Sequence, residues 1–221
     1  MKFLLPVILL WAFQAQAQLH TETVIYKQDT TTLEGYLAYD QSIQGTRPGI
    51  LVVHEWNGLG DYVKMRADSL ARLGYVAFCA DIYGKGVRPT TQDEMGKQAG
   101  FYRSNRPLMR ARAKAGLDQL LKNKLVDPKK IAVIGYCFGG GVALELARSG
   151  ANIAGAVSFH GNLDTPNPDD AKNIKCRVLV LHGGNDPYVT RDNVNALWDE
   201  MTKAGVDWQM VVYSGAVHGF T

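Results

Sequence analysis

The sequence predicts a single α/β domain with a mostly parallel central sheet of about eight strands and helices on both faces. Two observations support this fold class. Apolar runs with the length of buried strands alternate with amphipathic segments of about 10–15 residues, which is the pattern of right-handed βαβ units. The 221 residues suit one sizeable domain, and no internal repeat or linker divides them.

The predicted strands differ in their hydrophobic pattern along the chain. Residues 23–28 and 33–40 lie close together in the sequence and should form an antiparallel pair at the start of the sheet. The later strands are near-continuous apolar runs, as expected where both faces of a strand are covered. These later strands are 48–56, 75–81, 127–137, 153–161, 176–184 and 207–215.

Four segments between those strands are predicted to be helices, and several of them end at a glycine, a common helix stop. They are 61–74, 106–123, 138–150 and 191–205. The stretch 82–100, which contains several glycines and a proline, is predicted to be a long loop. Parallel sheets place functional residues beyond the carboxyl ends of their strands, so the residues that follow each strand are the site candidates.

The N-terminus has the features of a secretory signal peptide. Lys2 is followed by an apolar run over residues 3–13 and by the cleavage-site pattern Ala15-Gln16-Ala17. The apolar run is shorter than the roughly 20 residues that span a bilayer. We therefore expect residues 1–17 to be removed, leaving a domain over 18–221 that is exported to the periplasm or secreted, with no membrane attachment after cleavage.

The overall composition argues against several functional classes. The chain is 46% hydrophobic and 20% charged, which is ordinary for a globular protein and unlike a disordered one. Its 24 basic and 21 acidic residues give a formal net charge of +3, and no basic cluster is interleaved with aromatic residues. We expect no nucleic-acid partner. A monomer or dimer that acts on a small molecule is the expected state.

Cysteine usage separates one cysteine from the other two. Cys79 and Cys176 lie in apolar runs, where a structural role is expected. Their strands should be well separated in the sheet, so no disulfide is predicted between them, even in an exported protein. Cys137 differs, because it lies between glycines at the junction of a strand and a helix.

The segment Gly135-Tyr136-Cys137-Phe138-Gly139 has the G-x-nucleophile-x-G form of a nucleophile elbow, with cysteine as the nucleophile. Only small residues beside the nucleophile allow such a sharp turn to pass close to neighbouring elements. The position at a helix N-terminus would also favour a thiolate. The alternative interpretation is a glycine-rich turn used for packing or for phosphate binding.

A thiol nucleophile needs a base and a group that orients the base. His218 follows the last predicted strand, and Asp186 follows the strand before it. The chain order nucleophile, acid, base is that of α/β-hydrolases, which is the fold we therefore predict. His20 lies near the N-terminus, and His54, His160 and His182 lie at strand ends, where a single backbone hydrogen bond is the simplest role.

Five segments together resemble the dienelactone hydrolase family of α/β-hydrolases: VVHEWNGL, ADIYGKG, GYCFGG, LHGGNDPYV and GAVHGF. The resemblance extends from residue 52 to residue 220. It implies a catalytic triad of Cys137, Asp186 and His218. It also implies that Glu55 interacts with the resting thiol and takes part in its activation when substrate arrives.

The resemblance also implies the groups that surround the substrate. The oxyanion donors fall on the backbone N–H groups of Trp56 and Phe138, and we assign Tyr83 and Lys85 to substrate binding. Characterised members carry two arginines that bind the carboxylate of a lactone. This sequence has Lys85 near one of those positions, and the other falls just beyond Thr221. Lysine supplies a charge without the planar fork of arginine.

Cysteine chemistry narrows the expected substrates. A tetrahedral intermediate expels its weakest base, and a thiolate is a far weaker base than an alkoxide, so ordinary esters and amides revert. An enol ester or a lactone with a stabilised enolate as leaving group proceeds forward. We therefore predict a hydrolase that cleaves an activated ester or lactone, such as carboxymethylenebutenolide, through a thioester acyl-enzyme, with no metal and no organic cofactor.

Two other functional classes are alternatives to this one. A catalytically silent binding or scaffold protein could retain the fold, and a thiol redox sensor would need a resolving cysteine near Cys137, which the sequence does not place there. Family members continue past the histidine with a C-terminal helix. That helix is missing here, so we expect the sequence to be a fragment and one face of the strand 207–215 to be uncovered.

Overall fold

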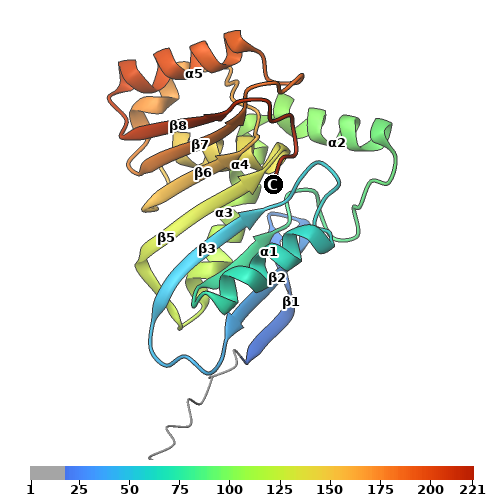
Figure 1. Ribbon diagram of the computed structural model, residues 1–221. Helices are drawn as coiled ribbons and strands as arrows, with labels where there is room; N and C mark the ends of the chain where they lie inside the picture. Colours follow the sequence, from blue (N-terminus) through green and yellow to red (C-terminus); the bar gives the residue numbers. More distant parts are fainter. Residues whose placement is uncertain (1–17) are drawn as a thin grey trace, which may run out of the picture.

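The computed structural model describes residues 18–221, and the predicted signal peptide at 1–17 lies outside the described residues. The strands form one eight-stranded sheet in the order β1-β2-β4-β3-β5-β6-β7-β8 (Figure 1). Their bounds are β1 (Leu19–Gln28), β2 (Thr31–Asp40), β3 (Arg47–Val53), β4 (Val76–Ala80), β5 (Val126–Tyr136), β6 (Gly155–Phe159), β7 (Arg177–Gly183) and β8 (Trp208–Tyr213).

The pairing within this sheet follows the sequence pattern. β1 pairs with β2 and β2 pairs with β4 in antiparallel fashion, while every pairing from β4 through β8 is parallel. The parallel strands are the near-continuous apolar runs, and the buried residues of β3 and β4 show why such runs suit a covered strand. The predicted mostly parallel α/β sheet of about eight strands is confirmed.

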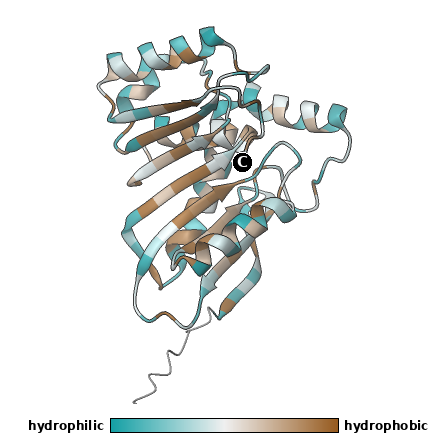
Figure 2. Cartoon of the chain, in the orientation of Figure 1, coloured by the Kyte–Doolittle hydropathy of each residue, from teal (hydrophilic) through white to brown (hydrophobic). Residues whose placement is uncertain are grey.

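Five α-helices and one 3₁₀ helix connect the strands in the described part of the chain. They are α1 (Asp61–Arg72), α2 (Gln92–Ser104), α3 (Arg106–Lys122), α4 (Phe138–Arg148), η1 (Pro168–Asn173) and α5 (Arg191–Ala204). None of the helices within residues 18–221 combines the length and the apolar character needed to cross a membrane. Figure 2 shows apolar residues, in brown, on the central strands and hydrophilic residues, in teal, in patches on the outer helices.

One element contradicts the sequence-based prediction. Residues 92–104 form α2, although the whole stretch 82–100 was expected to be a loop. A capping box starts this helix: the Thr91 side chain accepts from the backbone N–H of Glu94, and the Glu94 carboxylate accepts from the backbone N–H of Thr91. The two glycines inside α2, Gly96 and Gly100, lower its helix propensity and conceal it from a composition argument.

The two faces of the sheet are covered to different extents. On one face, α3 and α4 enclose the larger part of the apolar core. On the other face, α1 covers a smaller cluster over β3 and β4. No helix lies over β5 to β8 on that second face within the described residues (Figure 1). Apolar side chains there, among them Ile134, Val157 and Leu181, are accordingly only half-buried.

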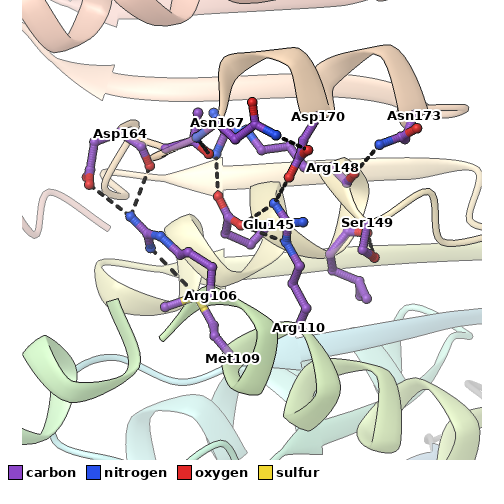
Figure 3. Close-up of polar contacts among 12 residues, drawn as sticks. Arg106, Met109, Arg110, Glu145, Arg148, Ser149, Asp164, Asn167, Asp170 and Asn173 are labelled. Atoms are coloured by element: carbon purple, nitrogen blue, oxygen red, sulfur yellow. Dashed lines mark hydrogen bonds and ion pairs between the residues drawn. The ribbon is translucent and has the colours of Figure 1, made fainter. Parts of the chain in front are cut away.

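A network of buried ion pairs joins the helices behind the sheet. The Arg148 side chain is fully buried, and its guanidinium contacts Glu145 at 3.0 Å and Glu200 at 2.7 Å. Arg110, from α3, reaches the same Glu145 at 2.8 Å and Asp170 of η1 at 2.6 Å (Figure 3). Buried charges persist only when paired, so these contacts fix α3, α4, α5 and η1 relative to one another.

Candidate active site

The turn between β5 and α4 carries Cys137 in a strained backbone conformation. Its φ of 52° and ψ of −118° lie where residues with a side chain are rarely found. A Cβ on Gly135 would overlap the carbonyl oxygen of Gly139, and a Cβ on Gly139 would overlap that of Val53. Both flanking glycines are therefore required by contact, which is the steric basis of the G-x-C-x-G pattern.

The acid and base candidates are joined by a hydrogen bond. His218 Nδ1 lies 2.8 Å from Asp186 Oδ2, and the Asp186 side chain is completely buried. The other oxygen of Asp186 accepts from the backbone N–H groups of Tyr188 at 2.9 Å and Val189 at 3.3 Å. Because Nδ1 of a neutral His218 donates to Asp186, its Nε2 carries the free lone pair.

The electrostatic surroundings of Cys137 oppose ionisation of the resting thiol. Burial raises the pKa of Cys137 to about 11, and the charge of Glu55 acts in the same direction. The backbone N–H groups of Phe138 and Trp56 act in the opposite direction and lower this pKa. Within residues 18–221 no hydrogen bond joins the thiol to His218, whose ring nitrogen bonds Asp186. At neutral pH the resting thiol is protonated.

Glu55 lies two residues beyond the end of β3, in a tight turn closed by a hydrogen bond from the Gly58 N–H to the Glu55 carbonyl at 3.2 Å. Partial burial raises the pKa of the Glu55 carboxyl, and the charges of His218 and Arg66 oppose that rise. The carboxylate thus lies within electrostatic reach of both the thiol and the base candidate. The sequence resemblance assigns Glu55 a part in activating the thiol, and that role stays a prediction.

The two predicted substrate-binding residues occupy different environments. Tyr83 is buried, its hydroxyl donates to the Trp56 carbonyl at 3.0 Å, and its ring packs against Phe138 at 5.3 Å. Tyr83 therefore supports the loop that carries Trp56. Lys85 is exposed, and its side chain makes no hydrogen bond or ion pair with any residue of 18–221; its backbone N–H donates to the Thr32 carbonyl at 2.9 Å.

Two of the remaining histidines have no role in this arrangement. His54 donates from Nδ1 to the Glu55 carbonyl at 2.6 Å and accepts at Nε2 from the Ile82 N–H at 3.2 Å. Burial lowers the pKa of His54 to about 4, so it stays neutral. His182 is buried, and its Nδ1 has no hydrogen-bond partner in the described chain. Residues 18–221 contain no cluster of three His, Cys, Asp or Glu side chains arranged to hold a metal ion.

Sequence reasoning missed two side chains on α1 that border the site. Tyr62 and Arg66 share one helix face, and the Arg66 guanidinium donates to the Tyr62 hydroxyl at 2.9 and 3.0 Å. The same guanidinium lies over the Tyr136 ring, 5.5 Å from its centroid. The sequence does contain a signal for this pair. The two residues are four apart near the start of a helix that follows the Glu55 loop, and this spacing places them on one helix face.

Cys79 and Cys176 are buried free thiols in the structure. Cys79 lies in β4 and Cys176 lies directly before β7, with β3, β5 and β6 between those strands. The structure thus separates them as the sequence analysis predicted.

The model of the dienelactone hydrolase family matches residues 33–221 of the chain. Among solved structures, a dienelactone hydrolase-like promiscuous phosphotriesterase, P91, from metagenomic libraries is 39% identical. The two superpose with a TM-score of 0.89, over 93% of this chain and 85% of that one. A structure from Klebsiella pneumoniae, provisionally named a dienelactone hydrolase, shares the fold at 21% identity and a TM-score of 0.79.

Curated relatives give the same picture. Protein usf of Aquifex pyrophilus is 31% identical over 204 residues, which is 90% of this chain and 86% of the relative. A protein of Aquifex aeolicus, provisionally named a carboxymethylenebutenolidase, is 29% identical with the same shares covered. A Bradyrhizobium protein, provisionally named a 2-oxo-3-(5-oxofuran-2-ylidene)propanoate lactonase, is 25% identical over 86% of this chain and 81% of its own length.

Proposed function

Because the chain belongs to the dienelactone hydrolase family and is an ester or lactone hydrolase, we propose that it works through a Cys137–His218–Asp186 triad. The observation that carries this proposal is that a strained Cys137 and a hydrogen-bonded His218–Asp186 pair all lie beyond the carboxyl ends of the parallel strands. Each of the three follows the carboxyl end of a different strand, where open parallel sheets carry their active sites.

The first half of the proposed reaction forms a thioester. His218 Nε2 takes the proton of the Cys137 thiol, and the sulfur attacks the carbonyl carbon of the ester or lactone. The negative charge on the carbonyl oxygen is received by the N–H groups of Trp56 and Phe138. Collapse of this intermediate breaks the bond to the leaving oxygen, which departs as an enolate and then takes the proton from His218, or takes that proton as it departs, so that His218 is neutral again before the second half.

The second half releases the acid. Water, deprotonated by His218, attacks the thioester carbon, and the oxyanion again lies against the Trp56 and Phe138 N–H groups. Collapse expels the Cys137 sulfur, which recovers its proton, and the carboxylic acid departs. Asp186, buried and held by two backbone N–H groups, keeps the ring of His218 oriented and stabilises its charged form in both halves.

Glu55 is proposed to control when the thiol becomes reactive. Its charge raises the pKa of the resting thiol, and the Trp56 and Phe138 N–H groups bind the sulfur instead of an oxyanion. A substrate carbonyl that enters this position displaces the sulfur toward His218. His218 then takes the thiol proton as described above, and Glu55 takes part in this activation through its charge, so that a reactive thiolate forms only when substrate is bound.

The proposed substrates are lactones and esters with a stabilised leaving group. A thiolate leaves more readily than an alkoxide, so only an activated ester commits to the thioester. The provisional names of the two relatives above describe unsaturated lactones that carry a carboxylate. We propose Lys85, an exposed cation on the loop after β4, as a group that meets such a carboxylate.

The test of the triad is the turnover of p-nitrophenyl acetate with and without iodoacetamide. Wild type should release a rapid burst of p-nitrophenolate close to one equivalent per site. Prolonged treatment with iodoacetamide, until the slowly reacting resting thiol is fully alkylated, should abolish the burst. Cys137→Ala should lose the burst, and His218→Ala should slow it by about 10³-fold. Cys79→Ala is the matched control, since this buried thiol lies elsewhere in the sheet. Full turnover in Cys137→Ala would exclude the mechanism.

A further inference from the structure

The imidazole of His160 contacts the backbone N–H of the proposed nucleophile, Cys137. The Cys137 N–H donates to the Phe159 carbonyl at 3.0 Å and also to His160 Nδ1 at 3.2 Å. The pairing of β5 with β6 places Tyr136 opposite Phe159, so the residues that follow, Cys137 and His160, meet where the strands end. The contact is therefore fixed by the register of the sheet.

The hydrogen bonds of His160 determine which ring nitrogen carries the proton. Nδ1 accepts from the Cys137 N–H, so the proton of a neutral ring lies on Nε2. Nε2 lies 3.0 Å from the Thr221 hydroxyl oxygen, to which it donates. Burial and the neighbouring His218 lower the pKa of His160 to about 4, which keeps Nδ1 available as an acceptor at neutral pH.

The same ring also contacts the proposed base. The ring centroids of His160 and His218 are 4.9 Å apart at an angle of 68°. Tyr188 packs against His218 at 5.2 Å, also edge to face. Together with the hydrogen bond to Asp186, these contacts restrict the tilt of the His218 ring.

The backbone at both residues is unusual. Cys137 has φ 52° and His160 has φ 40°, and they are two of the three non-glycine residues with positive φ in the described chain. Positive φ costs on the order of 1–3 kcal/mol at a residue with a side chain and persists only where surrounding contacts hold it. A second acceptor on the Cys137 N–H holds the peptide plane between Tyr136 and Cys137, from which the Cα–Cβ bond that carries the sulfur projects.

We propose that His160 is a positioning residue of the active site, in which Nδ1 accepts the Cys137 N–H to fix the sulfur while the ring packs against His218. This inference rests on the proposed function. His160 reaches neither the oxyanion donors nor the reacting atoms, so it acts through Cys137 and His218. It sets the distance between nucleophile and base, on which the rate of acylation depends.

Two substitutions at His160 distinguish the effect of the hydrogen-bond acceptor from the effect of the rest of the side chain. Asparagine and glycine both tolerate positive φ, and both remove the ring. Only asparagine retains an acceptor, its Oδ1, near the position of Nδ1. The pair His160→Asn and His160→Gly therefore differs in the hydrogen bond to the Cys137 N–H.

The measurement is the burst rate of p-nitrophenolate per active site, with sites counted by the burst amplitude and folding followed by thermal unfolding. We expect His160→Gly to lower the burst rate by about 10- to 100-fold with KM within threefold of wild type. We expect His160→Asn to recover most of that loss. If glycine does not fold, His160→Phe, which keeps a ring and lacks the acceptor, takes its place in the comparison with asparagine.

Equal burst rates per site in the asparagine variant and the acceptor-free variant would overturn the proposal. So would a loss of activity that follows the loss of folded protein while the burst rate per site stays at the wild-type value. The proposed function fails in a different way, because wild type would then show no Cys137-dependent burst. The two failures are therefore distinguishable in one set of traces.

Discussion

At Cys137, two groups of neighbours shift the pKa of the thiol in opposite directions. Burial and the Glu55 carboxylate favour the neutral thiol, while the N–H groups of Phe138 and Trp56 favour the thiolate. Burial dominates, and the pKa of the thiol rises to about 11. A resting nucleophile in this state reacts slowly with electrophiles that do not displace it, so the thiol is protected between turnovers.

Removing the charge of Glu55 should make the resting thiol more reactive. In Glu55→Gln one cause of the raised thiol pKa is absent, so the pKa of Cys137 should fall and the thiolate fraction near pH 8 should rise. We expect iodoacetamide to alkylate Cys137 a few-fold to about 10-fold faster at pH 8 in this variant. Ester turnover should fall in the same variant, because Glu55 takes part in activation.

The measurement is the alkylation rate of Cys137 between pH 7 and 10, read by mass spectrometry. Glu22→Gln is the matched control, since Glu22 lies on the exposed edge strand β1. An alkylation profile unchanged in Glu55→Gln would show that Glu55 does not influence the thiol.

The sequence identifies most residues of this candidate site, and the structure shows which part of the arrangement it leaves open. Cys137, Asp186 and His218 follow strands and carry motif signals, so they can be named from sequence; their catalytic roles stay predictions. The contact between His160 and the Cys137 N–H depends on the register between β5 and β6, which the sequence does not specify. A strand-end histidine therefore appeared to have only a structural role.

At the level of elements, the helices behind the sheet are held by charges as well as by apolar packing. Arg148 of α4 binds Glu200 of α5 and Glu145 within its own helix. Glu145 has a second partner in Arg110, and Arg148 is the ion-pair partner that the structure shows for Glu200 (Figure 3 shows the part around Arg110 and Arg148). Loss of Arg148 would therefore leave Glu200 without its ion-pair partner, whereas Glu145 would keep Arg110.

Truncating Arg148 should strongly destabilise the protein. Arg148→Met leaves Glu200 buried without a counter-charge, which should lower the free energy of unfolding by about 3–5 kcal/mol. In the double variant Arg148→Met/Glu200→Leu, no unpaired carboxylate remains at that position, and we expect a smaller loss than in the single variant. Urea unfolding followed by circular dichroism measures both.

Arg177→Met is the matched control for that comparison. Its ion pair with Asp207 joins two exposed side chains, so removing it should change stability by less than about 1 kcal/mol. A double variant no more stable than Arg148→Met would show that the cost comes from lost packing of the long side chain instead of the stranded charge.

The elements themselves were predicted well where periodicity was strong and poorly where it was weak. The parallel strands and helices α1, α3, α4 and α5 appear within a few residues of their expected bounds. Helix α2 escaped detection because Gly96 and Gly100 dilute its pattern, although Thr91 and Glu94 had the spacing of a capping box. Cap residues were more informative there than composition.

For the molecule as a whole, the sheet order could not be read from the chain. The sequence indicates parallel strands, but the placement of β4 between β2 and β3 follows from a crossover that only the three-dimensional packing selects. That order brings the loops after β3, β5, β7 and β8 to one edge, where Glu55, Cys137, Asp186 and His218 lie.

Buried neutral histidines should make the whole fold sensitive to acid. The pKa of His54 is about 4 in the folded protein against an ordinary value of 6.5. Between those values the unfolded chain binds a proton that the folded protein does not, so stability is full above pH 6.5 and falls as the pH drops toward 4. His54 alone should account for about 3 kcal/mol over this range. His160 titrates in the same window.

Urea unfolding at steps between pH 7.5 and 4.5 tests this expectation. The free energy of unfolding should fall with a slope of at least about 1.4 kcal/mol per pH unit near pH 5. The slope should be shallower in His54→Gln, which keeps a donor and an acceptor and has no titrating ring. A free energy independent of pH from 7 to 5 would mean that His54 is charged or exposed in the native protein.

The last strand of the sheet has a consequence for the behaviour of the protein in concentrated solution. β8 reads WQMVVY, with no charged residue and no proline, and it forms the edge of the sheet in the described chain. β1, at the opposite edge, carries Glu22 and Lys27. An uncharged edge of this composition is a template for intermolecular strand pairing, and charges are what usually prevent it. The strand that leads to His218 is thus also where molecules would first join into larger aggregates.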